Sequence, residues 1–221
     1  MKRIDAMEIL RILNLSHNIR KAGLEEISVA LDKIEHHTVE RIPWPEFSYK
    51  PQVSFSIAYD QNVILLKYFV RENFIRMQCY SDNGPVYHDS CVEFFIAFDS
   101  EEEYYNLEFN CTGACMAGFG SGRTDRKLID ENLLSDIRRL SVIKCFRDHE
   151  RQFFDWELTL VIPCKIFAYS NISNLKERSC RANFYKCGDK LPEPHFLAWR
   201  NVKAATPDFH LPEYFGSVYF T

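Results

Sequence analysis

The chain has 221 residues, of which 46% are hydrophobic and 26% are charged. This composition is typical of a globular protein, and a chain of this length buries enough surface to fold without disulfides or metals. The formal net charge of -4 is the wrong sign for a surface that neutralises phosphates, so nucleic acid is excluded as an expected partner.

The N-terminal segment has no secretory signal, because its most apolar stretch, AMEILRILNL, carries Glu8 and Arg11. No run reaches the ~18 uninterrupted apolar residues of a membrane span, so no membrane partner is expected. We therefore expect a cytoplasmic protein, or a secreted or periplasmic one if a leader peptide preceded this sequence. Several of the eight cysteines lie in apolar runs, which predicts buried, reduced thiols.

Apolar residues recur at helical spacing between residues 4 and 35, which predicts a partly helical lead-in. They include Ile4, Met7, Ile9 and Leu13, and the same spacing continues after Gly23. We interpret residues 1–22 as an N-terminal extension and residues 23–221 as one domain.

From about residue 50, short runs of β-branched and aromatic residues are bounded by turn residues, which is an all-β pattern. The expected strands are VSFSIAY, VILLKYFV, FIRMQCY, CVEFFIAF, YYNLEFN, FDWELTLVI, RANFYK and GSVYF. The stretch from Gly118 to Gly122 is interpreted as a flexible hairpin, and one short helical insertion is expected near residues 129–140. The strands are too evenly spaced for βαβ units, so the predicted fold is a two-sheet antiparallel β-sandwich.

Two neighbouring strands carry polar residues on one face. In CVEFFIAF, side chains alternate so that Glu93 lies on the face opposite Val92 and Phe94. In the next strand, Asn106, Glu108 and Asn110 lie on one face. The apolar residues Leu107 and Phe109 lie on the other face. The two polar rows are expected to line one concave surface.

No motif for nucleophilic, metalloprotease or nucleotide chemistry is present. The cysteines form no CxxC pair, so a zinc site would have to be assembled from distant strands. Glu93 and Glu108 are a candidate glycosidase pair, which needs two carboxyls about 5 to 9 Å apart across a cleft. Unpaired acids in sandwich strands more often bind a hydroxyl, an arginine or a cation, so no catalytic residue is assigned.

Two aromatic residues flank the expected strands. Tyr87 follows a Gly-Pro turn, and Trp199 lies in the segment PHFLAWRNV. Aromatic faces suit the apolar C–H faces of pyranose rings, while acids and amides bind hydroxyls. The alternative is that both rings only pack against the core or its rim.

The order of several segments resembles that of a known family. These segments are DSCVEFFIAF, YYNLEFNCTG, FDWELTLVIP, RANFYKCGD, PHFLAW and PEYFGSVYF. The chain resembles the family 9 carbohydrate-binding modules from about Leu24 to Phe220, in particular the free-standing, cysteine-containing proteins of this type in Bacteroidetes bacteria. The first twenty or so residues lie outside the resemblance.

The resemblance implies a non-catalytic β-sandwich, stabilised by calcium, that holds a sugar chain end between two aromatic rings. By position, Tyr87 corresponds to the first ring, which is tryptophan in the best-known members, Glu93 to the hydroxyl-binding acid and Trp199 to the second ring. Local context adds Glu108, Asn110 and Asn183 as further candidates for binding the sugar. It also adds Asp89 as a candidate metal ligand.

The predicted function is therefore carbohydrate binding, without catalysis, in an accessory role beside glycoside hydrolases that act on polysaccharides such as xylan or cellulose. Three alternatives stay open. The first is a haem-binding sandwich in which Met77 or Met116 and a histidine such as His88 hold the iron. The others are a glycoside hydrolase using Glu93 and Glu108, and an interaction module with no small ligand.

Overall fold

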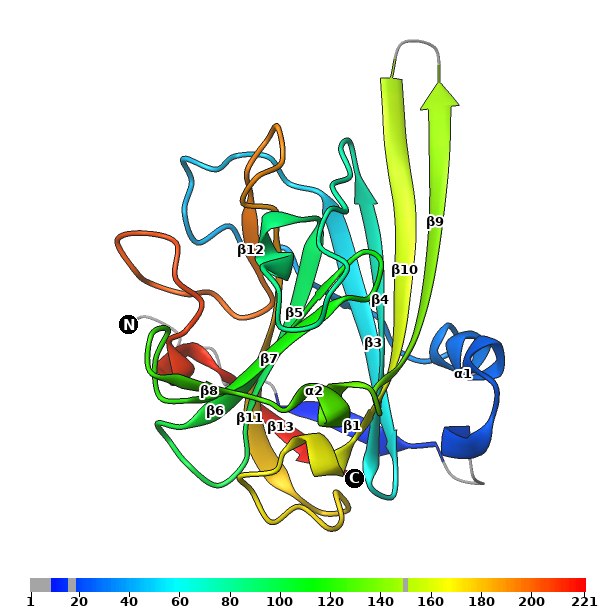
Figure 1. The fold of residues 1–221 in the computed structure, drawn as a ribbon, viewed down its shortest axis with the longest axis vertical. Coiled ribbons are helices and arrows are strands. Elements are labelled where there is room, and N and C mark those ends of the chain that lie inside the picture. Colours follow the sequence, from blue (N-terminus) through cyan, green and yellow to red (C-terminus); the bar gives the residue numbers. More distant parts are fainter. Residues whose placement is uncertain (1–8, 16–18, 149–150) are drawn as a thin grey trace, which may run out of the picture.

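Two β-sheets pack face to face in the computed structural model, which describes residues 9–15, 19–148 and 151–221 (Figure 1). Sheet A contains, in spatial order, β8 (Arg126–Leu128), β7 (Cys115–Gly120), β6 (Tyr104–Asn110), β5 (Cys91–Ala97), β11 (Ser179–Cys187) and β13 (Gly216–Phe220), with β12 (Phe196–Ala198) also paired to β11. Sheet B contains β3 (Gln52–Asp60), β4 (Val63–Glu72), β10 (Arg151–Pro163) and β9 (Arg138–Asp148), with β2 (His37–Thr38) on β3. The predicted β-sandwich is confirmed.

Helical segments are short and lie outside the two sheets. They are α1 (Leu24–Leu31), α2 (Glu131–Leu134) and the 3-10 turns η1 (Ile19–Lys21), η2 (Val86–His88), η3 (Cys164–Ile166) and η4 (Pro212–Tyr214). No helix among the described residues is long and apolar enough to cross a membrane.

The first strand, β1 (Leu10–Asn14), joins the two sheets. Residues 10–12 pair in parallel with β13, and residues 13–14 pair in parallel with β3. These two pairings depart from the antiparallel arrangement of the other strand pairs described. Part of the segment that we set apart as an extension therefore supplies a strand that connects sheet A to sheet B.

Helical spacing was a misleading signal in this part of the lead-in. Leu10 and Ile12 are buried, whereas Ile9 and Leu13 are about half exposed, so burial alternates with the period of a strand. A short apolar run fits both periods, and pairing with two strands decides between them. The expected helix is found at α1, after Gly23, while Ile4 and Met7 lie outside the described residues.

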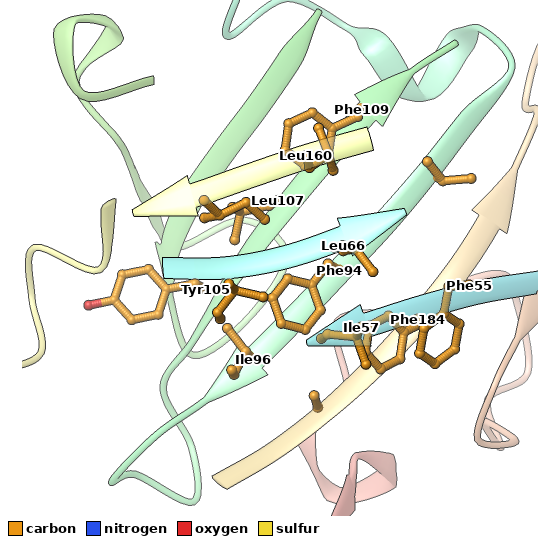
Figure 2. Close-up of a cluster of buried hydrophobic side chains, with 14 of the residues drawn as sticks. Phe55, Ile57, Leu66, Phe94, Ile96, Tyr105, Leu107, Phe109, Leu160 and Phe184 are labelled. Carbon is orange, nitrogen blue, oxygen red and sulfur yellow. The ribbon is translucent and has the colours of Figure 1, made fainter. Parts of the chain in front are cut away.

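Aromatic and branched side chains from both sheets fill the space between them (Figure 2). Phe55 of β3 stacks on Phe184 of β11 with ring centroids 3.7 Å apart, and Phe94 of β5 stacks on Phe184 at 5.1 Å. These rings connect the two sheets through the middle of the core. The face predicted for β5 is confirmed, because the core includes Val92, Phe94, Ile96 and Phe98.

Three segments differ from the sequence prediction. FIRMQCY forms no strand, because the backbone amides of Gln78 and Cys79 donate to the Asp89 carboxylate instead of to a neighbouring strand. The glycine-rich stretch begins inside β7, which pairs with β6 up to Gly120. The helical insertion is limited to α2, and β9 already begins at residue 138.

The outer faces of the two sheets are covered differently. On sheet B, Ile27 and Leu31 of α1 pack against Leu65 of β4 and its neighbours. On sheet A, loops bring Trp44 and Phe215 against the outer face, around residues of β5 and β11. A cavity lies on the same outer face of sheet A.

A buried ion pair connects the two sheets beside the core. The Lys186 ammonium of β11 lies 3.0 Å from a Glu72 carboxylate oxygen of β4, and both side chains are fully buried. The indole of Trp156 donates to the other Glu72 oxygen at 2.6 Å. His195 lies 2.8 Å from Lys186, and burial lowers its pKa to about 3, so its ring is neutral and accepts from the ammonium.

We expect Glu72→Gln to lower the free energy of unfolding by about 3 to 5 kcal/mol, because it leaves the buried Lys186 charge without its counter-ion. The double variant Glu72→Leu with Lys186→Met should recover most of this loss, since it removes both charges. Chemical denaturation of the three proteins measures both changes. If the native chain and Glu72→Gln were equally stable, the ion pair between Glu72 and Lys186 would not stabilise the fold.

Candidate functional site

A cavity of about 360 Å³ lies on the outer face of sheet A. Its floor comes from β5, β6 and β7, and its walls come from η2, the turn between β7 and β8, and the loop that precedes η4. Tyr87, Glu93 and Glu108 all line it, so the structure brings three of the predicted residues together. The concave polar surface expected on the two neighbouring strands is thus present.

Glu93 and Glu108 form the acidic floor of the cavity. They are directly opposite each other in the β5–β6 register, and both are more than nine-tenths buried. Burial and the neighbouring carboxyl raise the pKa of Glu93 well above its usual range, and burial raises the pKa of Glu108 to about 7. Because like charges repel, ionisation of one glutamate disfavours ionisation of the other.

Arg126 orients Glu108 through Asn106. The Arg126 Nε donates to Asn106 Oδ1 at 2.8 Å, and Asn106 Nδ2 donates to Glu108 Oε1 at 2.8 Å. The remaining Arg126 donors bind backbone carbonyl oxygens, including those of Gly118 and Gly122. A Cβ at Gly118 would lie 3.0 Å from Asn106 Oδ1 and 3.3 Å from Arg126 Nε, so glycine makes room for this chain of hydrogen bonds.

Further polar groups lie around the acidic pair. Arg123 and Asp189 line the cavity, and Arg123 is exposed at its rim, where its positive charge counters the effect of burial on both glutamates. His210 Nδ1 lies 2.9 Å from the Tyr104 hydroxyl. Burial and Arg126 lower the pKa of His210 to about 3, so this wall residue is neutral.

The aromatic surface of the cavity comes from Tyr87, Phe196 and Phe209. Phe209 stacks on Tyr185 with ring centroids 4.1 Å apart, which fixes its ring against sheet A. Phe196 is half-buried and lies edge-on to Phe209. Aromatic side chains therefore line the cavity on two sides. Tyr87 lies on the side formed by η2, and Phe196 and Phe209 lie on the side formed by β12 and the loop before η4.

Trp199, the predicted second ring, is not among the residues that line this cavity. Its ring packs against Phe55 and Phe184 of the core, and the Arg200 guanidinium lies 4.0 Å from the ring centroid. A Cβ at Gly216 would come within 2.7 Å of the indole, which shows how closely the chain surrounds it. This placement corresponds to the packing alternative of the sequence analysis.

The two predicted asparagines hold the backbone outside the cavity. Asn110 accepts from the Thr112 and Ala114 amides and donates to Asp89. Asn183 accepts from the Arg200 amide and donates to the Arg200 carbonyl oxygen, and so fixes the loop after β12. Neither side chain lines the cavity.

Asp89 has surroundings that do not fit a calcium ion. Its Oδ2 accepts from Gln78, Cys79 and Asn110, and its Oδ1 lies 3.3 Å from the Arg76 guanidinium. Calcium requires six to eight oxygen ligands, whereas these neighbours present hydrogen-bond donors and a positive charge. Asp89 instead organises the loop before η2, and the structural calcium stays a prediction of the resemblance.

One group of side chains among the described residues has donor atoms close enough together to share a metal ion. It comprises Cys91, Glu93 and Cys187, whose donor atoms lie within 4.8 Å of one another. Of the residues considered for haem, Met116 lines the cavity, while Met77 and His88 do not.

Sequence reasoning missed Arg126, Asp189 and Phe209. All three come from loops or from the short β8, where no periodic pattern marks the direction of a side chain. The run GFGSGRTDR contained Arg126, but nothing in one sequence indicated that its guanidinium turns back to Asn106.

Comparison with known proteins places this geometry in a family. The chain matches Carbohydrate-binding family 9 over residues 24–220. A crystal structure of a candidate carbohydrate-binding protein from Bacteroides uniformis ATCC 8492 superposes with a TM-score of 0.84 and 33% identity, and the match covers 96% of this chain and 97% of that chain. No curated protein matches the chain.

Two more distant structures share the fold. They are of a family 9 carbohydrate-binding module from Caldicellulosiruptor kristjanssonii, in complex with glucose and with cellotriose, at TM-scores of 0.61 and 0.60 and 12% identity. The matches cover 97% and 96% of this chain and 96% and 93% of the other chains. Because the family match spans nearly the whole sequence and a relative over almost the full length is one-third identical, the protein belongs to carbohydrate-binding family 9.

Proposed function

We propose that the cavity on sheet A binds the end of a carbohydrate chain without catalysing its cleavage. The observation that carries this proposal is the buried pair Glu93 and Glu108 on the floor of a cavity that also presents aromatic side chains. Carboxylates accept hydrogen bonds from sugar hydroxyls, and aromatic rings pack against the apolar faces of a sugar ring.

The size of the cavity supports a short ligand segment. Its volume of about 360 Å³ is near the lower end of the range for small-molecule sites, so it suits one or two sugar rings rather than a long chain lying across the surface. Glucose and cellotriose occupy the related Caldicellulosiruptor structures, and cellotriose is therefore the first ligand to test. Xylotriose, with the same number of sugar rings, is the matched comparison.

We assign the hydroxyl-binding role to Glu93 and Glu108 and the ring-packing role to Tyr87 together with Phe196 and Phe209. Asn106 already occupies one Glu108 oxygen and so leaves the other for the ligand. The two acids are adjacent on neighbouring strands of one floor, an arrangement suited to gripping neighbouring hydroxyls. A glycosidase pair instead faces the scissile bond from opposite sides of a cleft.

Both acids should contribute to binding. We expect Glu93→Gln and Glu108→Gln each to weaken cellotriose binding several-fold, because the amide replaces one acceptor oxygen with an NH2 group that can only donate, and a lost hydrogen bond costs about 0.5 to 1.5 kcal/mol. Calorimetric titration measures the change, with the exposed Glu26→Gln on α1 as the matched control. The proposal fails if both site variants bind as tightly as the control.

Substitutions of Tyr87 and of Trp199 should affect different properties, saccharide binding in the first case and stability in the second. Tyr87→Ala should weaken saccharide binding several-fold with little loss of stability, because its half-buried ring lines the cavity. Trp199→Ala should instead lower the free energy of unfolding by about 3 kcal/mol and leave binding by the folded protein unchanged, because the indole packs on Phe55 and Phe184. Calorimetry and denaturant unfolding of both variants test this; a stable Trp199→Ala protein that binds no saccharide would restore Trp199 as the second ring.

The acidic floor should also make the stability of the ligand-free protein depend on pH. The pKa of Glu108 rises from an ordinary 4.5 to about 7 in the folded chain, and that of Glu93 is also raised well above its usual range. The folded state therefore binds more protons than the unfolded state in this window, so the free energy of unfolding should fall as pH rises from about 5 to about 7.

Glu108→Gln should flatten this fall, because the variant has one fewer titrating carboxyl on the floor. Denaturant unfolding of the ligand-free proteins at several pH values measures the slope, with Glu26→Gln again as the control. An unchanged slope in Glu108→Gln would show that Glu108 titrates as an ordinary surface carboxyl.

A further inference from the structure

Two cysteines lie beside Glu93 on the outer face of sheet A, and one of them, Cys187, lines the cavity. Cys91 and Glu93 are two residues apart on β5 and point to the same face, and Cys187 of β11 is directly opposite Cys91 in the register. The sulfur atoms of both cysteines and a carboxylate oxygen of Glu93 lie within 4.8 Å of one another. All three side chains are buried, yet Glu93 and Cys187 line the cavity, so a small cation has a route to the group.

We propose that Cys91, Glu93 and Cys187 form a binding site for a zinc-class divalent cation whose fourth coordination position opens into the cavity. Two sulfur ligands and one carboxylate suit Zn²⁺ or Co²⁺, whereas Ca²⁺ and Mg²⁺ require mostly oxygen ligands. Three protein ligands with one open position is the arrangement that zinc sites use to hold a water or another exchangeable ligand.

The observed spacing is compatible with this coordination. With Zn–S bonds of about 2.3 Å and a Zn–O bond of about 2.0 to 2.2 Å, neighbouring donors in a tetrahedral site are separated by roughly 3.5 to 3.8 Å. Donors that already lie within 4.8 Å of one another reach this spacing by contracting by at most about 1.3 Å.

Burial raises the pKa of the Cys91 thiol to about 12, and hydrogen bonding and burial raise that of Cys187 well above its usual range. A divalent cation must displace these protons, so its affinity should increase with pH. Among the surrounding charges, Glu108 and Asp189 favour the cation, whereas Lys186 and Arg123 oppose it.

This inference goes beyond carbohydrate binding and does not depend on it, although Glu93 belongs to both sites. The thiol groups have no part in the proposed recognition of sugar hydroxyls. A metal titration contains no saccharide, so a failure to bind metal leaves the proposed function intact. A failure to bind saccharide leaves the metal site equally intact.

Cobalt provides a direct test, because thiolate ligands give Co²⁺ a charge-transfer absorption in the near ultraviolet. The full chain is reduced with a phosphine, its free thiols are counted, and Co²⁺ is added without oxygen. We expect the band to saturate at one ion per chain and to disappear when Zn²⁺ displaces the Co²⁺. Absence of the band in fully reduced protein would overturn the proposal.

Variants identify the ligands. Cys91→Ser and Cys187→Ser should each lose the charge-transfer band or at least half its intensity, while Cys180→Ser should retain it. Cys180 is the matched control because it is a buried cysteine on the same strand, β11, that faces the opposite side into the core. Glu93→Gln should weaken Co²⁺ binding by at least about tenfold, since losing even a group that only orients a metal ligand costs about 10- to 100-fold.

Circular dichroism verifies that each variant is folded, and Cys187→Ala replaces Cys187→Ser if the serine variant does not fold. A band that persists unchanged in the Cys91 and Cys187 variants would place the ion elsewhere and overturn the proposal. So would a Cys91–Cys187 disulfide that mass spectrometry finds and that the phosphine does not reduce, because the two thiols would then serve as a covalent cross-link between β5 and β11.

Discussion

The alternation of side chains along β5 and β6 is the constraint on which both the core and the cavity depend. Phe94 and Leu107 point into the space between the sheets, while Glu93 and Glu108 point to the opposite face. A shift of either strand by one residue would exchange these sets and place carboxyls in the core. The register that packs the sandwich is therefore the same register that pairs the two acids.

A pair of buried acids lowers the stability of the free protein, since two carboxyls have lost most of their water and repel each other when ionised. Arg126 relieves this only through its charge, which lowers the pKa of Glu108, because its donors are occupied by backbone carbonyl oxygens and by Asn106. Its hydrogen bonds hold the β7–β8 turn in place and orient Asn106, which in turn orients Glu108. Within the chain, Glu108 accepts a hydrogen bond from Asn106 and Glu93 accepts one from the Cys187 thiol, and the hydroxyls of a sugar are suitable donors for the remaining acceptor positions of the two acids.

Much of this arrangement was predictable from the sequence, because strand periodicity is a local property. The alternation in β5 and β6 correctly indicated that Glu93 and Glu108 share one surface with Asn106. The strand β1 was not predictable in this way, because its apolar residues fit helical spacing and only pairing with β3 and β13 defines it. Loop residues such as Phe209 were missed for a related reason, since their direction is set by tertiary packing.

Trp199 and Phe209 lie at different places on sheet A, Trp199 against the core and Phe209 at the cavity. Both follow β11 and lie within one long loop region, and either is large enough to form a wall. Asn183 fixes the backbone at Arg200, and the Trp199 amide donates to the Phe184 carbonyl oxygen, so the chain is held against the core at this point. Only after this anchored segment does the loop pass over the outer face of sheet A, where Phe209 reaches Tyr185.

The strand β11 links the stability of the sandwich to the chemistry of the cavity. Lys186 points between the sheets to Glu72, and the next residue, Cys187, points to the cavity, since neighbouring side chains in a strand face opposite ways. The Lys186 ammonium also donates to the Cys187 carbonyl oxygen at 2.9 Å, and its positive charge counteracts the rise in the pKa of Cys91 and of Asp189. Glu72 balances that charge from the other sheet. The ion pair that joins the sheets thus also sets part of the electrostatic potential at the cavity floor, although none of its atoms needs to touch a ligand.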